Sequence, residues 1–288
     1  EFNKNPKIED VHKGISLFKK NKCDYVIAIG GGSVMDMAKL INVGQAQNKN
    51  IEEIIIKNKK LNSCGKKLIV IPTTSGSGSE ATHFAVVYIN SKKYSLAHTD
   101  YLLPDVVFLW PFLTYSLSSY QTAVSGIDAF SQSIESYWSI SSNEESKKYA
   151  TQAIEIILNN LGDAVIKNSL ISKNKMIYAS YLAGKAINVS KTTGAHAISY
   201  YLTSKFNIPH GQAVALTLPL WFEYNTNASE ESLNDIRGIK YLKKTMLKLG
   251  ELVKYKKCKY PKECLKLFIE DIGLETKLSR LNVSEMHI

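Results

Sequence analysis

Two histidines and one aspartate have the side chains needed to bind a divalent metal ion. His196 and His210 lie in one short stretch of the chain, and Asp128 lies well upstream of both. Imidazole nitrogens together with a carboxylate oxygen make a ligand set that suits Fe2+ or Zn2+. A single histidine is more often a surface or core residue, so the hypothesis of a metal site depends on the three residues occurring together.

Asp128 also begins a polar pattern with helical spacing. Gln132 and Glu135 follow it at i+4 and i+7, which places all three on one face of a helix. A buried face of this kind needs partners for its polar groups, and a metal ion is one such partner. A solvent-exposed face is the more common alternative when the pattern stands alone.

The sequence Gly-Gly-Gly-Ser-Val-Met-Asp at 30–36 is a candidate phosphate-binding loop. It follows an apolar stretch that predicts a strand over 25–29, and it precedes helical spacing over 35–43. Glycines let a backbone approach a phosphate closely, and the N-terminus of the next helix adds N–H donors. The stretch is not the G-x-G-x-x-G fingerprint of ordinary dinucleotide-binding folds, and glycine at many such turns has only a steric reason.

A second loop, Thr-Thr-Ser-Gly-Ser-Gly-Ser-Glu at 73–80, follows a predicted strand over 68–71. Its hydroxyl groups and small residues can hydrogen-bond a pyrophosphate, a ribose or a nicotinamide amide, whereas a surface turn is the alternative. Two such loops, each at the end of a buried strand, favour one shared nucleotide-binding crevice.

The spacing of apolar residues predicts two domains. Helical spacing over 7–20 and strands over 25–29, 68–71, 84–89 and 106–109 indicate an α/β domain with a parallel sheet over residues 1–110. An all-α domain over 111–288 follows, because helical periodicity then dominates. Its expected helices cover 116–138, 144–160, 173–188, 193–204, 211–222, 232–250 and 262–272. The first domain is small for a nucleotide-binding sheet, so we expect that N-terminal βα units are missing from this sequence.

Composition restricts the partners and the compartment. The chain has 288 residues and a net charge of +10, mostly from dispersed lysines without nucleic-acid-binding signatures, so a solvated surface is favoured over a nucleic-acid partner. No apolar run approaches the roughly 20 residues of a membrane span, and no secretory apolar region opens the chain. The four cysteines form no zinc motif. We therefore expect a cytoplasmic protein with reduced thiols and no membrane partner.

Five segments resemble the iron-containing (group III) alcohol dehydrogenase family in their order and spacing. They are Asn-Pro at 5–6, the loop at 30–36, the loop with its preceding proline at 72–80, Gly-Ile-Asp-Ala at 126–129 and Pro-His-Gly at 209–211. The resemblance implies an α/β nucleotide-binding domain followed by an all-α domain, the architecture shared with dehydroquinate synthase. It also implies NAD or NADP and a divalent metal in the cleft between the domains, and it allows a homodimer.

The resemblance also assigns roles to single residues. Asp128, His196 and His210 match three metal ligands of the family. Gln132 stands where the family usually has the fourth ligand, a histidine, and its neutral oxygen would bind more weakly. Tyr200 stands where a further family histidine is usual, and it is a candidate proton donor to the alkoxide.

Cofactor contacts are implied for residues of both loops and for one lysine. The residues implied to contact the pyrophosphate are Gly31, Gly32, Ser33 and Asp36. Those implied to line the ribose and nicotinamide are Thr73, Thr74, Ser77 and Ser79. Lys93 matches a family lysine near the cofactor. The implied reaction is hydride transfer from nicotinamide C4 to an aldehyde whose oxygen the metal polarises as a Lewis acid.

The stretches at 128–139, 185–193 and 196–203 resemble the phosphonoacetaldehyde reductases, also called hydroxyethylphosphonate dehydrogenases. This implies reduction of phosphonoacetaldehyde to 2-hydroxyethylphosphonate in phosphonate biosynthesis. A dianionic aldehyde needs a cationic pocket. Candidates are His83 and Lys191, for which a structural histidine and a surface lysine are the alternatives.

The sequence is also compatible with three other functions. One is a broad-range alcohol or glycerol-type dehydrogenase of the same superfamily, whose partners are also small aldehydes and alcohols. Another is a non-catalytic nucleotide-binding fragment. The third, a nucleic-acid-binding protein, is suggested only by the charge.

Overall fold

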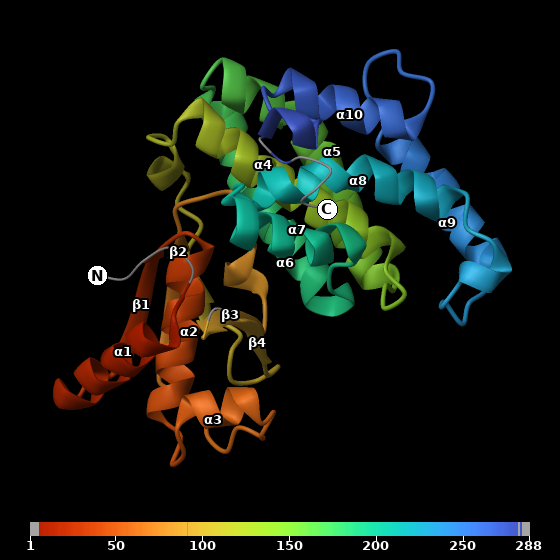
Figure 1. Cartoon of the computed structure of the whole chain (residues 1–288). Coiled ribbons are helices and arrows are strands. Elements are labelled where there is room, and N and C mark those ends of the chain that lie inside the picture. Colours follow the sequence, from red (N-terminus) through yellow and green to blue (C-terminus); the bar gives the residue numbers. More distant parts are fainter. Residues whose placement is uncertain (1–5, 91, 282, 284–288) are drawn as a thin grey trace. The chain divides into compact units, whose positions relative to one another are not determined.

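The computed structural model describes residues 6–90, 92–281 and 283, so Asn5 of the first family segment lies outside the described residues. The chain divides into two compact units (Figure 1). The first, called here the α/β unit, comprises Glu1–Thr74 and Gly78–Leu113. The second, the helical unit, comprises Ser75–Ser77 and Thr114–Ile288.

The α/β unit contains a parallel sheet of order β1-β2-β5, formed by Tyr25–Gly30, Lys67–Pro72 and Val106–Val107. Helix α2 (Gly32–Gln45) packs on one face of this sheet, where Ala28, Leu68 and Val70 form a small core with the helix. The alternate residues of β1 point the other way and are exposed: Tyr25, Ile27 and Ile29. The two strands therefore end beside the start of α2, where both predicted loops begin.

The strand predicted over 84–89 forms, but it does not join the parallel sheet. It is β3 (Phe84–Ile89), and it pairs antiparallel with β4 (Lys92–Ala97) in a separate two-stranded sheet. Sequence reasoning missed β4 because its residues are mostly polar, and it missed α3 (Ile51–Ile56) because six residues are too few to show a period. Helix α1 (Ile8–Lys20) packs with α2 and matches the prediction over 7–20.

Over its described residues, the helical unit has seven α-helices joined by short connections, with 3-10 turns between some of them. They are α4 (Ser119–Trp138), α5 (Glu144–Ile166), α6 (Leu170–Ser190), α7 (Gly194–Phe206), α8 (His210–Thr226), α9 (Ile239–Leu252) and α10 (Pro261–Asp271). Side-chain caps begin three of them, since Ser118, Asn143 and Ser169 each accept a backbone N–H of the helix that follows.

Helix α4 is the centre of the helical unit. It packs against α5, α6, α8 and α9, and its side chains are buried on every side over most of its length. A helix buried all round must find partners inside the protein for each polar side chain it carries. The polar residues of α4 therefore decide what is built around it.

The predicted helix boundaries are wrong in places. The helices predicted to end at residues 160 and 222 continue to Ile166 and Thr226, and one predicted start is far too early. The sequence predicts a single helix over 232–250, but the structure has a 3-10 turn at Glu230–Ser232 and begins α9 only at Ile239. Gly238 has a φ of +81° directly before α9, which interrupts helical geometry. Asp235 stabilises the intervening turn by accepting hydrogen bonds from the backbone and side chain of Arg237.

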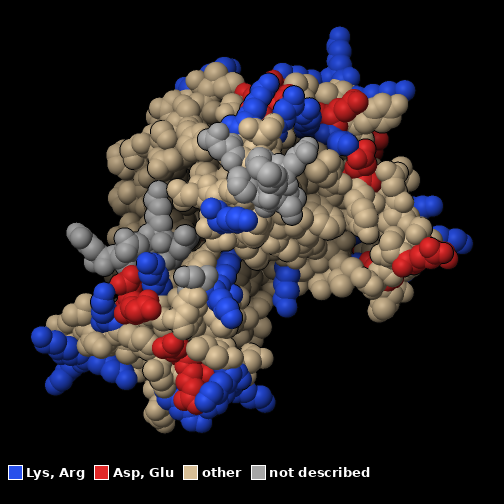
Figure 2. All heavy atoms as spheres, in the orientation of Figure 1, with Lys and Arg blue, Asp and Glu red and all other residues tan. Residues whose placement is uncertain are grey.

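The surface shows how the net charge is distributed. In Figure 2, Lys and Arg side chains are scattered and interspersed with Asp and Glu on the visible face. No helix in the described part of the chain is long and apolar enough to cross a membrane.

A buried lysine fixes the segment that follows the second loop. Lys39 of α2 is fully buried, and its Nζ donates to the carbonyl oxygens of Ser79 (2.6 Å), Thr82 (2.7 Å) and Phe84 (3.0 Å). Burial lowers the pKa of Lys39 to about 8, although Asp36 and Glu80 oppose this change. The ammonium group therefore ties residues 79–84 to α2.

Asp36, one turn before Lys39, continues the same attachment. Its carboxylate accepts a hydrogen bond from Ser79 Oγ (2.6 Å) and another from the backbone N–H of Val86 (3.0 Å). Asp36 and Ser79, both expected to contact a cofactor, are thus hydrogen-bonded to each other.

Glu80 is the one buried carboxyl group beside Lys39 that lacks a complete set of partners. It is 1% exposed, and its Oε1 atom has no hydrogen-bond partner among the described residues. Burial raises the pKa of Glu80 to about 7, and the nearby Lys39 only partly opposes this.

Replacing Glu80 with glutamine should make stability less dependent on pH. The pKa of Glu80 in the folded protein is above its usual value of 4.5, so the folded state favours the neutral carboxyl group. The free energy of unfolding is therefore highest below about pH 4.5, and this stabilisation is lost as the pH rises through about 7. The gain of Glu80→Gln over the unchanged protein should therefore be larger at pH 7.5 than at pH 5, by at most about 3 kcal/mol. Urea unfolding at both pH values measures it.

The exposed Glu9 of α1 provides the matched control for this experiment. Glu9→Gln should change the free energy of unfolding by the same small amount at both pH values. An equal effect of Glu80→Gln at pH 5 and pH 7.5 would contradict the assignment.

Candidate functional site

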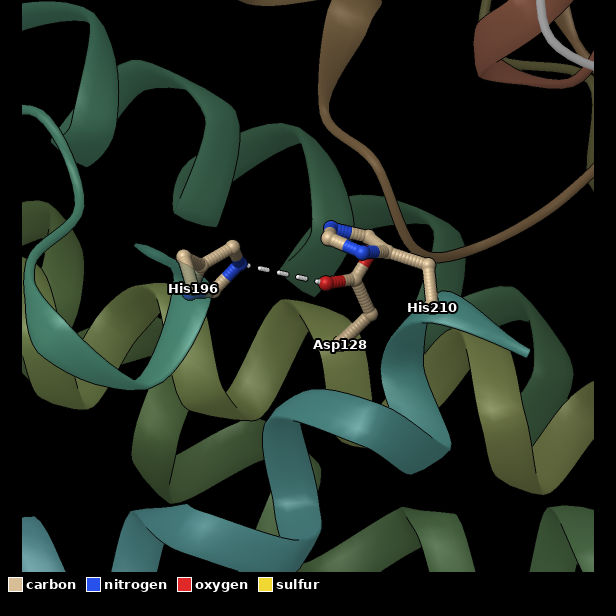
Figure 3. A group of neighbouring side chains, drawn as sticks. All are labelled: Asp128, His196 and His210. Atoms are coloured by element: carbon tan, nitrogen blue, oxygen red, sulfur yellow. Dashed lines mark ion pairs between the residues drawn. The ribbon is translucent and has the colours of Figure 1, made fainter. Parts of the chain in front are cut away.

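Three helices of the helical unit bring the predicted metal ligands together (Figure 3). Asp128 lies on α4, His196 on α7 and His210 at the start of α8, and one ligand atom of each lies within 4.8 Å of the others. His196 Nε2 is 3.3 Å from Asp128 Oδ1. Asp128 and His196 are buried, and His210 is partly exposed. The arrangement leaves the cluster reachable from the side of His210.

The buried polar atoms of this cluster fit a metal ion. Asp128 Oδ1, His196 Nε2 and Gln132 Oε1 are buried and make no hydrogen bond to any residue that the structure describes. Leaving a buried polar atom without a partner costs about 1–3 kcal/mol. One cation could satisfy Asp128 Oδ1 and His196 Nε2, which cluster with a nitrogen of His210. Carboxylate and imidazole donors suit Fe2+ or Zn2+.

Gln132 lies one turn after Asp128 on α4, where the family usually has a histidine. Its Nε2 donates to the carbonyl oxygen of Ser77 at 3.3 Å, so Oε1 is the atom left for another partner. Ser77 can approach because Gly76 lies against α4, where an added Cβ would be only 2.8 Å from the carbonyl oxygen of Ser125.

The position of His210 depends on the glycine that follows it. A Cβ on Gly211 would lie 2.0 Å from the carbonyl oxygen of Val124 and 3.1 Å from the Cβ of Asp128. Only glycine lets the first turn of α8 approach α4 this closely. The Pro-His-Gly segment therefore has a packing reason as well as a chemical one.

Tyr200 lies against His210. The two rings stack with centroids 5.9 Å apart and planes 12° apart, and His210 Nδ1 is 3.2 Å from Ser199 Oγ on the preceding helix. Tyr200 is 38% exposed, so its hydroxyl-bearing ring forms part of the accessible side of the cluster.

The cluster is strongly coupled electrostatically. Burial opposes protonation of His196, but Glu135 and Asp128 outweigh it and raise the pKa of His196 to about 9. Burial also opposes ionisation of Asp128, but His196, His210 and Gln132 together hold its pKa below the usual value.

The sequence predicts for Glu135 only a place on the polar helix face shared with Asp128 and Gln132, where a metal ion is one possible partner; the structure gives it a different partner. Glu135 contacts His196 Nδ1 through Oε2, and it is completely buried. The helical spacing placed it on the same face as Asp128 and Gln132. No sequence pattern indicated its partner, because His196 lies on another helix.

The α/β unit brings most of the expected cofactor residues together. Thr73 N–H donates to the carbonyl oxygen of Gly30 at 3.0 Å, and a Cβ on Gly31 would lie 3.3 Å from Thr74 Oγ1. The residues that converge at the carboxyl ends of β1 and β2 are Gly31, Gly32, Ser33, Thr73 and Thr74. This edge of a parallel sheet, beside the N-terminus of α2, is where nucleotides bind in related architectures.

The other predicted residues lie elsewhere. Ser77 belongs to the helical unit, and Lys93 lies on β4 of the α/β unit. His83 precedes β3 and packs edge-on against Phe84. Lys191 is exposed and ends α6.

The chain thus combines two features. Its α/β unit has the topology of nucleotide-binding domains, and its helical unit carries a cluster of side chains that can hold a metal ion. Family models match both parts: the model for iron-containing alcohol dehydrogenase covers residues 1–111, and the C-terminal model of the Fe-containing alcohol dehydrogenase family covers residues 122–288. The chain belongs to the iron-containing alcohol dehydrogenase family, and the predicted fold class is confirmed.

Individual proteins agree with the family models. Long-chain-alcohol dehydrogenase 1 of Geobacillus thermodenitrificans is 33% identical over 283 residues, which cover 97% of this chain and 70% of that protein. The probable alcohol dehydrogenase EutG of Escherichia coli is 34% identical over 238 residues, covering 80% of this chain and 59% of that protein. The sulfoacetaldehyde reductase of Bifidobacterium kashiwanohense, solved in complex with NAD+, superposes with a TM-score of 0.86 at 30% identity, covering 99% of this chain and 73% of that one.

Removal of a ligand should abolish tight metal binding. His210→Ala deletes one of the three clustered ligand atoms. Removing a residue that only hydrogen-bonds to a metal ligand lowers metal affinity by about 10–100-fold, so we expect the loss of a ligand itself to lower the affinity for Zn2+ or Fe2+ by more than about 100-fold. Competition with a chelator measures this affinity on folded protein checked by circular dichroism. Tyr200→Phe keeps the stacked ring and serves as the control with unchanged affinity. Equal affinity in His210→Ala and the unchanged protein would exclude His210 as a ligand.

Proposed function

We propose that the protein is a metal-dependent NAD(P)H oxidoreductase that reduces an aldehyde to a primary alcohol. The observation that carries the proposal is the cluster of Asp128, His196 and His210, in a chain of this family. Within the described residues, the buried atoms Asp128 Oδ1 and His196 Nε2 of this cluster make no hydrogen bond. A bound Fe2+ or Zn2+ would supply Lewis-acid polarisation of the carbonyl oxygen. Fe2+ is the metal that the family name favours.

The residues at the ends of β1 and β2 would bind the cofactor. Backbone N–H groups at the start of α2, around Gly32 and Ser33, can donate to phosphate oxygens, and the hydroxyls of Thr73 and Thr74 can hydrogen-bond the sugar. Asp36 and Lys39 would act indirectly by holding the second loop in place. NAD is supported by the NAD+ complex of the similar sulfoacetaldehyde reductase, and NADP remains the alternative.

The proposed substrate is phosphonoacetaldehyde, which would be reduced to 2-hydroxyethylphosphonate. Support comes from the resemblance of residues 128–139, 185–193 and 196–203 to phosphonoacetaldehyde reductases. The similar sulfoacetaldehyde reductase is named for another short aldehyde with an anionic group. The net charge of +10 would favour the approach of such substrates. Tyr200, beside His210, or water would deliver the proton to the alkoxide oxygen.

The backbone at Lys191 supports a role for this residue in recognising the anion. Its φ of +61° and ψ of 176° fall in a region used almost only by glycine, which costs about 1–3 kcal/mol. Hydrogen bonds from Lys191 N–H to Ile187 and from Ser190 Oγ to the Lys191 carbonyl hold this conformation. Strained residues of this kind concentrate at functional sites. His83 of the α/β unit is the second candidate.

A broad-range alcohol dehydrogenase is the second candidate function. It is favoured by the names of several relatives, which include 1,3-propanediol dehydrogenase of Klebsiella pneumoniae, 31% identical over 234 residues. Uncharged alcohols would then be used as well as the phosphonate.

Steady-state reduction of phosphonoacetaldehyde and propionaldehyde, with NADH and with NADPH, separates the two functions. We expect kcat/KM to favour the phosphonate by about 100-fold, the value of one charged hydrogen bond. Lys191→Gln should remove most of this preference, whereas Lys167→Gln, at the end of α5, should keep it. Equal kcat/KM values would favour the broad-range enzyme. If the metal-loaded protein reduces neither aldehyde with either cofactor, the proposed function is wrong.

A further inference from the structure

The two ring nitrogens of His196 face two different carboxylates. Nε2 lies 3.3 Å from Asp128 Oδ1, whereas Nδ1 contacts Glu135 Oε2. Nε2 makes no hydrogen bond within residues 6–90, 92–281 and 283, and it belongs to the ligand cluster. Glu135 is completely buried, and the only charged side chain it contacts in the described part of the chain is His196. The ring is therefore held from the side opposite to the cluster.

The second oxygen of Glu135 is saturated by donors from the start of α7. Oε1 accepts hydrogen bonds from Thr193 N–H (3.1 Å), Thr193 Oγ1 (2.7 Å) and Ala195 N–H (2.9 Å). Thr193, the N-cap residue of α7, makes no side-chain cap of its own. A carboxylate on α4 thus caps a helix that lies far away in sequence, at the end where negative charge is stabilising.

A neighbouring indole fixes the direction of one of these hydrogen bonds. Trp138 Nε1 donates to Thr193 Oγ1 at 2.8 Å. The threonine hydroxyl oxygen is thereby occupied as an acceptor, and its own proton is directed to Glu135. Oε1 consequently faces donors only.

We propose that Glu135 is a positioning residue that sets the tautomer of His196. Glu135 accepts a hydrogen bond from Nδ1–H, which leaves the lone pair of Nε2 directed at Asp128 and His210. By capping α7, Glu135 also fixes the position of the imidazole ring along that helix. A carboxylate behind a metal-binding histidine orients the ring and raises its basicity. The role requires only that the cluster binds metal, and in this respect it rests on the proposed function.

A glutamine at position 135 cannot replace the carboxylate. If its amide oxygen faces Thr193 and Ala195, its NH2 group faces Nδ1 and forces the imidazole proton onto Nε2, the atom that must bind the metal. If the amide is turned over, its NH2 group opposes the donors of Thr193 and Ala195. The near-isosteric change Glu135→Gln therefore tests the hydrogen-bond pattern rather than the volume.

The first experiment measures Zn2+ affinity by chelator competition, without cofactor or aldehyde. We expect Glu135→Gln to bind Zn2+ about 10–100-fold more weakly than the unchanged protein. Ser133→Ala is the matched control, because Ser133 is also buried on α4, and among the described residues its side chain hydrogen-bonds only to Ala129 of its own helix. Its Zn2+ affinity should not change. Glu135→Gln with unaltered Zn2+ affinity would overturn the proposal.

The second experiment reads the tautomer directly on the metal-free proteins. Nitrogen-15 NMR, at a pH where the ring-nitrogen shifts themselves show a neutral imidazole, should place the proton of His196 on Nδ1 in the unchanged protein, where Glu135 accepts from it, and on Nε2 in Glu135→Gln. The same tautomer in both would also overturn the proposal. If Glu135→Gln does not fold, Thr193→Val removes one donor to Oε1 and should weaken Zn2+ binding to a smaller degree. Neither measurement needs catalytic turnover, so a negative reductase assay would not contradict the role of Glu135. A negative result for Glu135 would likewise leave the proposed reductase function untouched.

Discussion

The helical unit is organised by the need to satisfy carboxylates and an amide inside a helix that is buried on all sides. Asp128, Gln132 and Glu135 each need partners that α4 cannot supply. Glu135 finds them at the start of α7, which brings His196 into place. Asp128 faces His196 and His210. Asp128 Oδ1 and His196 Nε2, which make no hydrogen bond in the described part of the chain, are atoms that a cation would satisfy. Burying charge without partners would cost several kcal/mol, so the fold and the site solve one electrostatic problem together.

The α/β unit solves a related problem with the opposite charge. Lys39 lies fully buried among three carbonyl oxygens, and Asp36 on the same helix accepts from Ser79 and Val86. A glycine-rich loop next to a phosphate must be open to its ligand and yet stay in one conformation. The structure achieves this by fixing the segment after the second loop from within, which leaves Gly31, Thr73 and Thr74 at the open edge of the sheet.

Sequence reasoning succeeds where one element carries the whole signal. The period of α4 shows the face shared by Asp128, Gln132 and Glu135, and the glycine loops mark the ends of β1 and β2. It fails where the signal depends on a distant partner. The role of Glu135 depends on His196 and Thr193 of another helix, and the pairing of β3 with the largely polar β4 depends on cross-strand contacts. The start of α9 depends on the backbone of Gly238, which overrides a continuous apolar period.

The close approach of Gly211 to α4 affects how the spacing of Asp128 and His210 responds to substitutions elsewhere in the helical unit. Because α8 rests on the main chain of α4 at Val124, the separation between the segments that carry Asp128 and His210 is set by backbone atoms. Core side chains elsewhere in the unit can then change in size without altering the spacing of the two ligands. Substitutions at neighbours such as Gln132 and Tyr200 can therefore alter the chemistry of the cluster, while the distance between the segments that carry Asp128 and His210 stays the same.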